Sequence, residues 1–157
     1  MPKPTVFLSY SHQDEIWKDR VSTHLRVLGV LDVWDDRRID LGTTWRPEIQ
    51  AALEKADVAV LLISADFLTS KFILEQEIPI FLQRRKDDGL LVIPLIVRPC
   101  AWQAQSWLAS LQAHPKDARP LSRGRKAQVE EDLAALARKL QDLLGRRRPS
   151  PGAGDRA

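Results

Sequence analysis

Two long apolar runs constrain the fold of this chain more than any other feature. Val58–Ile63 and Leu90–Val97 are apolar almost without interruption, which is typical of strands buried on both faces of a parallel sheet. The segment 64–89 between them contains a capped helix, and Pro79 within it cannot donate a hydrogen bond to the carbonyl four residues earlier. We therefore expect two parallel strands joined by a helix that is kinked or broken near Pro79.

The amino-terminal part of the chain also alternates strands and helices. A first strand at Val6–Leu8 leads into a helix that Ser11 caps and that ends at Gly29. A second strand follows at Leu31–Trp34, and after a polar loop Thr44 caps the next helix. The strand–helix–strand pattern therefore begins at the start of the chain.

The part of the chain after Val97 is less regular until its last helix. A segment rich in Trp and Leu follows first and is expected to cover one edge of the core, and a brief strand is possible at Arg119–Leu121. The last helix has a continuous apolar stripe, formed by Val129, Leu133, Leu136, Ala137, Leu140, Leu143 and Leu144.

This alternation predicts an α/β fold in which right-handed crossovers place helices on both faces of a mostly parallel sheet. We expect an open, flavodoxin-like sheet of about five strands in the order 2-1-3-4-5. Ligands of such sheets bind beyond the carboxyl ends of the strands. The loops after Tyr10, Trp34 and Ile63 are therefore where a site is expected.

Composition excludes several classes of protein. With 157 residues, 44% of them hydrophobic, the chain suits one compact domain. It has no apolar run of roughly 18 residues and no signal peptide at its start, so we expect a cytoplasmic protein without a membrane span. Its single cysteine, Cys100, cannot form an internal disulfide or a thiolate zinc site, and we expect no metal.

The basic excess is concentrated at the carboxyl terminus. The formal charge is +3, and Arg146–Arg148 is followed by a stretch rich in Pro, Gly and Ala. We expect residues 1–144 to form the domain and residues 145–157 to be a disordered tail or linker. A solvated tail is favoured over nucleic-acid binding as the interpretation of this basic run.

Four segments, in order and on the expected elements, resemble the TIR (Toll/interleukin-1 receptor) domain, and in particular the bacterial type that cleaves NAD+. No single segment is specific, but the four together cover almost all of the expected domain. The second includes the family's BB loop, which Trp45 follows. The segments are Val6–Ser11, Trp34–Gly42, Ala56–Pro79 and Ile93–Cys100.

The resemblance implies a catalytic glutamate at Glu77. Glu75 is a close rival, but the Glu-Ile-Pro context and the spacing from Ser70 favour Glu77. Where some NAD+-cleaving relatives have Trp, this chain has Ile73, and the nearest aromatic residue is Phe72. The substrate-binding residues implied are Tyr10, Ser11, His12, Trp34, Trp45, Ser70, Phe72 and Ile73.

One carboxylate is sufficient for the implied reaction. Nicotinamide is a cationic leaving group in NAD+, so breaking its bond to ribose needs no strong general acid. A glutamate beside the ribose can stabilise the oxocarbenium-like charge that develops. NAD+ is then the substrate, and no cofactor is implied. Trp34 and Trp45 can equally be packing residues, and Ser11 is first of all a helix cap.

The resemblance also implies partners, and it leaves a second function open. Family members assemble with other TIR domains, as homo-oligomers or filaments, and the alternative to catalysis is an adaptor or scaffold that only binds such domains. A receiver domain is disfavoured because Ser9 and Tyr10 replace its acidic pair, and no Gly-rich phosphate loop supports a dehydrogenase or P-loop enzyme. The BB-loop assembly residues are Asp36, Arg37, Arg38, Ile39, Asp40, Leu41 and Gly42.

Overall fold

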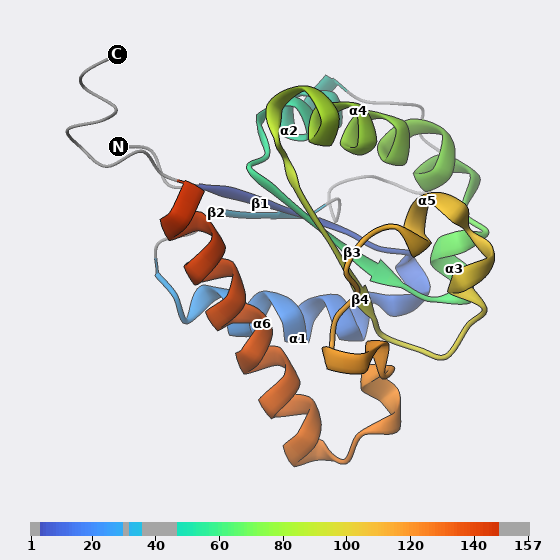
Figure 1. The fold of residues 1–157 in the computed structure, drawn as a ribbon, viewed down its shortest axis with the longest axis vertical. Helices are drawn as coiled ribbons and strands as arrows, with labels where there is room; N and C mark the ends of the chain where they lie inside the picture. The colour runs from blue at the N-terminus through green and yellow to red at the C-terminus, as the bar shows by residue number, and fades with distance from the viewer. Residues whose placement is uncertain (1–3, 30–31, 36–46, 148–157) are drawn as a thin grey trace.

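The computed structural model describes residues 4–29, 32–35 and 47–147. Within them the chain forms a parallel sheet of four strands in the order β2-β1-β3-β4, with helices on both faces (Figure 1). This confirms the α/β class and the predicted order of the first four strands. The strands are β1 (Thr5–Ser9), β2 (Asp32–Asp35), β3 (Val58–Ile63) and β4 (Leu91–Ile96).

The predicted fifth strand does not form at Arg119–Leu121. Arg119 and Pro120 are extended, but Leu121 already begins the 3-10 turn η5 (Leu121–Arg123). Next to β4 there is instead an isolated bridge at His114, whose N–H donates to the Pro94 carbonyl at 2.8 Å. Prolines at 115 and 120 explain the difference, because proline has no N–H with which to continue a ladder of hydrogen bonds.

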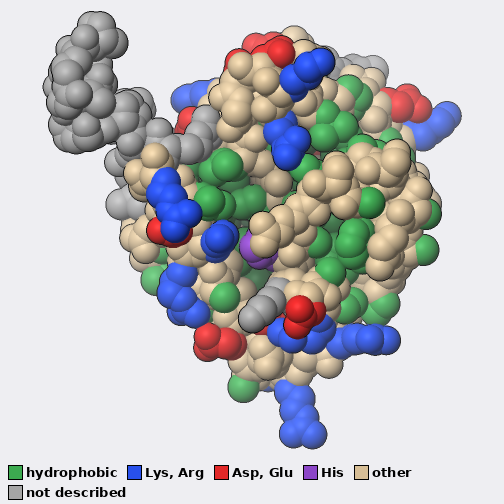
Figure 2. All heavy atoms as spheres, in the orientation of Figure 1, with side chains coloured by type: hydrophobic (Ala, Val, Ile, Leu, Met, Phe, Trp, Pro, Cys, Tyr) green, Lys and Arg blue, Asp and Glu red, His purple; other side chains and the backbone are tan. Residues whose placement is uncertain are grey.

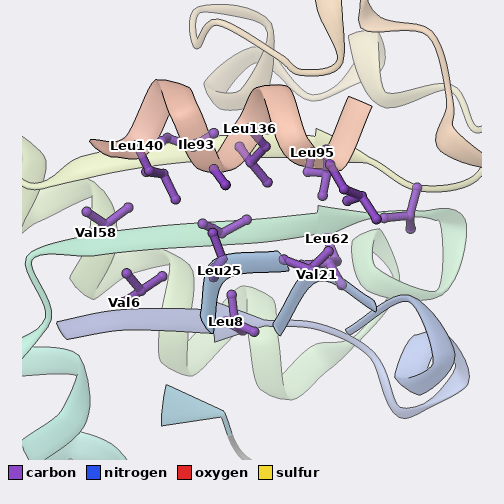
Figure 3. Close-up of a cluster of buried hydrophobic side chains, with 14 of the residues drawn as sticks. Val6, Leu8, Val21, Leu25, Val58, Leu62, Ile93, Leu95, Leu136 and Leu140 are labelled. Atoms are coloured by element: carbon purple, nitrogen blue, oxygen red, sulfur yellow. The ribbon is translucent and has the colours of Figure 1, made fainter. Parts of the chain in front are cut away.

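Helices α1 (Glu15–Arg26) and α6 (Lys126–Arg147) cover one face of the sheet. Alternate residues of each strand point to this face, and together with the apolar stripes of the two helices they form a continuous core (Figure 3). It includes Val6, Leu8, Leu25, Leu62 and Leu136. The stripe predicted for the last helix is therefore confirmed as its buried side.

Helices α2 (Pro47–Lys55) and α4 (Ile78–Asp88) cover the opposite face. The intervening strand residues point here and form a second cluster that contains Phe7, Leu53, Leu61 and Phe81. The Trp- and Leu-rich segment after β4 packs against this second cluster, as predicted. β1 and β3 are thus buried on both sides, which explains their apolar sequences.

The helix between β3 and β4 is broken, as was predicted from Pro79. Chain 65–88 forms α3 (Ala65–Leu68), a π-helical turn η2 (Ile73–Glu77) and α4, and Pro79 lies in the first turn of α4. In the π turn the Ile78 N–H bonds to the Ile73 carbonyl, five residues earlier. A π turn is a rare irregularity that is frequent at functional sites, and this one ends at Glu77.

The remaining elements are short. Ser11 caps the first of them, the 3-10 turn η1 that leads into α1, and not α1 itself, whose N-cap is Asp14. Gly29 follows α1 with a φ of 67°, the left-handed conformation that was predicted. α6 runs on to Arg147, so the predicted boundary at residue 144 lies inside this helix. These elements are η1 (His12–Asp14), η3 (Trp102–Ala104), α5 (Ser106–Ala109) and η4 (Lys116–Ala118).

Several features that the sequence singled out lie outside the described residues, namely Thr44, Trp45, the BB-loop residues 36–42 and the tail from residue 148. Among the helices that are described, none is long and apolar enough to cross a membrane. On the face in Figure 2, described Lys and Arg side chains are scattered and interspersed with Asp and Glu. That face therefore carries mixed charge.

Candidate active site

The carboxyl ends of β1, β3 and β4 meet at one edge of the sheet because the strands are parallel. Two acidic side chains, Glu77 and Asp14, are buried there, with exposed fractions of 0% and 1%. Each accepts a hydrogen bond from a serine at a strand end: Ser9 is the last residue of β1, and Ser64 follows β3. This edge is where open α/β sheets bind ligands.

Glu77 is held by the first strand. The Ser9 hydroxyl donates to Glu77 Oε1 at 2.5 Å, and both residues are fully buried. Ser9 lies two positions after Phe7, so the alternation of a strand directs it to the same face, the one that α2 and α4 cover. Glu77, the last residue of the π turn, faces the same side of the sheet. Its carboxylate is therefore buried at the carboxyl ends of the strands.

The structure separates the two rival glutamates. Glu77 is fully buried against Ser9, whereas Glu75, two residues earlier on the same π turn, is exposed. Residues two apart on a helical turn point in different directions, so only one of the pair can face the sheet.

The three predicted residues after β1 have different surroundings. Tyr10 is buried with the α1–α6 core, and its ring lies edge-on to that of His12, with 6.2 Å between the centroids. Ser11 Oγ accepts a hydrogen bond from the Gln13 N–H at 3.2 Å and caps η1. His12 is exposed to solvent. Ser11 therefore stabilises the turn η1, whereas His12 is accessible to solvent.

The other described candidates mainly pack. The half-buried Trp34 ring stacks on Phe7 with 4.7 Å between centroids. Ser70 Oγ accepts from the N–H of Ile73, the first residue of the π turn, at 3.3 Å. Ile73 is buried and Phe72 half-buried, both against the second core cluster. The geometry thus joins Glu77 to β1 but leaves Trp34 and Ile73 in the core.

The second buried carboxylate, Asp14, belongs to an ion-pair network. Arg98 follows β4, and its Nε donates to Asp14 Oδ1 at 2.7 Å while its Nη2 bonds to Asp66. The Ser64 hydroxyl donates to Asp14 Oδ2 at 2.5 Å. The two carboxylates raise the pKa of Arg98. The network therefore joins the loops that follow β1, β3 and β4.

Lys18 ties α1 to the second strand. Its side chain is only 1% exposed, and its Nζ lies 2.6 Å from Asp19 and 3.6 Å from Asp35, the last residue of β2. The same Nζ lies 5.5 Å from the centroid of the Tyr10 ring, within range of a cation–π attraction. This lysine thus connects the ends of β1 and β2.

Cys100 follows β4 near the same edge and is half-buried. This burial raises the pKa of its thiol. Burial therefore favours the protonated thiol over the thiolate, which is the nucleophilic form.

Sequence reasoning missed three residues of this edge: Ser9 as the partner of Glu77, Arg98 as a link between loops, and Lys18. A signal existed for two of them. Ser9 is polar within the buried strand Thr5–Ser9, and Lys18 lies on the apolar face of α1 with Val21 and Leu25. A polar residue at a core position needs a partner, but its identity depends on distant parts of the chain.

Comparison with known proteins identifies the family. The family model of the TIR domain matches residues 6–144. The chain belongs to the TIR domain family. An uncharacterized protein of Sinorhizobium fredii strain NGR234, y4lF, is 32% identical over 146 residues, which are 91% of this chain and 44% of that protein. This TIR chain therefore spans less than half the length of that relative.

Two solved TIR structures are similar in fold. The TIR domain of the Toll-related receptor TRR-2 of Hydra magnipapillata has a TM-score of 0.52 and 21% identity, over 74% of this chain and 89% of that one. The TIR domains of the activated Roq1 resistosome, which recognises the pathogen effector XopQ, give a TM-score of 0.53 and 19% identity, over 87% and 84%. At these identities the likeness supports the fold alone.

Proposed function

We propose that this TIR domain is an NAD+ nucleosidase of bacterial immune or virulence signalling, with Glu77 as its catalytic carboxylate. The observation that carries the proposal is the position of Glu77 at the carboxyl edge of the sheet, where it bonds to the last residue of β1. Ligands of open α/β sheets bind at this edge. The glutamate that the family resemblance points to therefore lies where a nucleotide is expected.

The chemistry requires one well-placed negative charge. The bond between ribose C1′ and the nicotinamide nitrogen breaks, and its electron pair leaves with nicotinamide, which becomes neutral. The Glu77 carboxylate stabilises the oxocarbenium-like ribose and accepts hydrogen bonds from the ribose hydroxyls. Water then attacks C1′ and loses a proton, giving ADP-ribose; attack by an adenine nitrogen gives a cyclic product instead.

The reaction requires the site to open. Glu77 is 0% exposed, so ribose cannot reach its oxygens in this state. We propose that self-association of TIR domains through the BB loop, residues 36–42, provides the opening. This chain shares its fold with the TIR domains of an activated resistosome, and this similarity supports an assembled active state. In the open state Tyr10, Ser11, His12, Trp45, Ser70 and Phe72 would border the substrate.

A scaffold without chemistry is the second candidate. The full burial of Glu77 favours it, because a domain without chemistry needs no access to this carboxylate. Two apolar side chains, Ile16 on α1 and Val27 just after it, are also 73% and 79% exposed. Eleven residues are close to three helical turns, so these two side chains lie on the same side of α1. Exposed apolar side chains suit contact with another protein, as a scaffold requires.

The deciding experiment measures nicotinamide release from NAD+ by the chain clustered on beads. The native chain should release nicotinamide, and Glu77→Gln should reduce release by at least about a hundredfold. Glu75→Gln is the matched control, because the exposed Glu75 carboxylate makes the same substitution nearby; it should keep most of the activity. No release from a folded, clustered native chain would favour the scaffold, and release that survives Glu77→Gln but not Glu75→Gln would move the role to Glu75.

A further inference from the structure

The Arg98 side chain bonds to two carboxylates at the carboxyl edge. It follows β4 and reaches Asp14, in the turn after β1, and Asp66, in the helix after β3. Asp14 is 1% exposed, and the guanidinium and the Ser64 hydroxyl bind its two different oxygens. The planar guanidinium is suited to this double contact, and a lysine ammonium is not.

The Arg98 network fixes the far end of a short loop whose near end is fixed by the sheet. Ser9 pairs with Leu61 in the sheet and holds Glu77 through its hydroxyl. Five residues later Asp14 is anchored by Arg98, and the Asp14 N–H closes the turn by donating to the Ser11 carbonyl at 2.8 Å. The loop 10–13 between these anchors is therefore held at both ends.

We propose that Arg98 is a positioning residue for NAD+ cleavage: acting through Asp14, it holds the loop 10–14 in the shape that receives the substrate beside Glu77. This inference rests on the proposed function. Arg98 itself touches no reacting atom. Its loss should therefore weaken the binding of NAD+ more than it slows the chemical step, because the loop orients the substrate while Glu77 stabilises the developing charge.

The test compares Arg98→Lys with Arg84→Lys in the clustered chain. Arg84, on α4, is a matched control because it also makes several bonds, to the carbonyls of Leu53 and Ala56 and to Asp88. These partners precede β3 and β4, so the bonds lie at the opposite end of the sheet. Arg98→Lys should raise KM for NAD+ roughly tenfold and change kcat by less than about twofold. Arg84→Lys should leave KM unchanged.

A second readout does not depend on activity. Hydrogen exchange at the amides of Gln13 and Asp14, which close the turn, should become at least about tenfold faster in Arg98→Lys and stay unchanged in Arg84→Lys. Asp66→Asn, a change at a half-exposed residue, should give a smaller increase in the exchange rate of these amides. This variant provides the test if Arg98→Lys does not fold.

The outcomes separate the two proposals. If native chain and Glu77→Gln behave as expected but Arg98→Lys has the native KM, the positioning role is wrong and the nucleosidase stands. Equal changes in KM for both arginine variants would also overturn it, because a general loss of stability would then explain them. If the native chain releases no nicotinamide, the nucleosidase fails, and with it the positioning role of Arg98 in NAD+ cleavage. Unchanged exchange would additionally show that Arg98 does not hold the loop.

Discussion

Two carboxylates are buried at the same edge of this sheet. Each accepts a hydrogen bond from a serine, but the other groups described around them differ. Glu77 accepts a hydrogen bond from Ser9, and Asp14 accepts one from Ser64; both bonds measure 2.5 Å and both serines are fully buried. Asp14 also forms an ion pair with Arg98. A cation offsets the cost of burying a carboxylate, and Asp14 is thereby tied to three loops.

The comparison teaches that burial and a serine partner do not by themselves identify a functional carboxylate. Asp14 is fixed by a cation that also bonds to Asp66, an arrangement that holds loops together. Glu77 ends a π turn, a local irregularity that the chain maintains next to Pro79. A structural charge and a proposed catalytic one thus differ in what surrounds them, and that difference can be measured.

The largest expected contrast is in stability. Asp14→Asn removes the buried partner of Arg98, and we expect it to lower the free energy of unfolding by about 2–3 kcal/mol, less than for a fully buried pair because Arg98 is 36% exposed. Glu77→Gln keeps an oxygen that accepts from Ser9 and removes a buried charge, so its effect should stay within about 1 kcal/mol. Urea denaturation of both variants measures this; equal losses would contradict the distinction.

The two serines provide a contrast of intermediate size. Ser64 donates to Asp14 and also accepts from the Phe67 N–H, capping α3, whereas Ser9 is described in one such bond. Ser64→Ala should therefore cost about 2 kcal/mol and Ser9→Ala about 1 kcal/mol. In a double-mutant cycle, Ser9→Ala should cost less in the Glu77→Leu background than in the native chain. Additive losses would show that the contact contributes nothing.

The smallest expected effect is a pH dependence of the stability of the fold. It is separate from any pH dependence of nicotinamide release at the site. Burial lowers the pKa of His114, and the positive charge of Lys139 lowers it further. Below pH 6.5, its ordinary value, the unfolded chain therefore binds more protons than the folded chain, so stability falls as the pH drops from 6.5 toward the lowered pKa. Since His114 is half-exposed, the slope should be well below the limit of about 1.4 kcal/mol per pH unit.

Replacing this histidine tests that effect. His114→Asn should flatten the fall in stability between about pH 7.5 and about pH 5.5. Urea midpoints at the two pH values measure the difference. A slope that persists in His114→Asn would assign the titration to another group, and the pH profile of nicotinamide release would need that correction.

The sheet was predictable because its signals are local. Val58–Ile63 is apolar at every position, which is typical of a strand buried on both faces, and Pro79 predicts the break in the following helix. The fifth strand was not predictable in the same way. Whether a short extended segment joins an edge depends on N–H groups that the prolines around Arg119 do not supply.

The sequence by itself determined the class of fold, the order of the first four strands and, through the family resemblance, the choice of Glu77 as the candidate. Only the tertiary structure decided that Glu77 is buried against Ser9 while Glu75 faces solvent, and that Arg98 joins Asp14 to Asp66. The physical reason is range. The apolar patterns that predict strands and helices involve residues close together in the sequence. Ser9 and Glu77, by contrast, are 68 residues apart, and Asp14 and Arg98 are 84 apart. Such contacts exist only once the parallel strands bring their carboxyl ends to one edge.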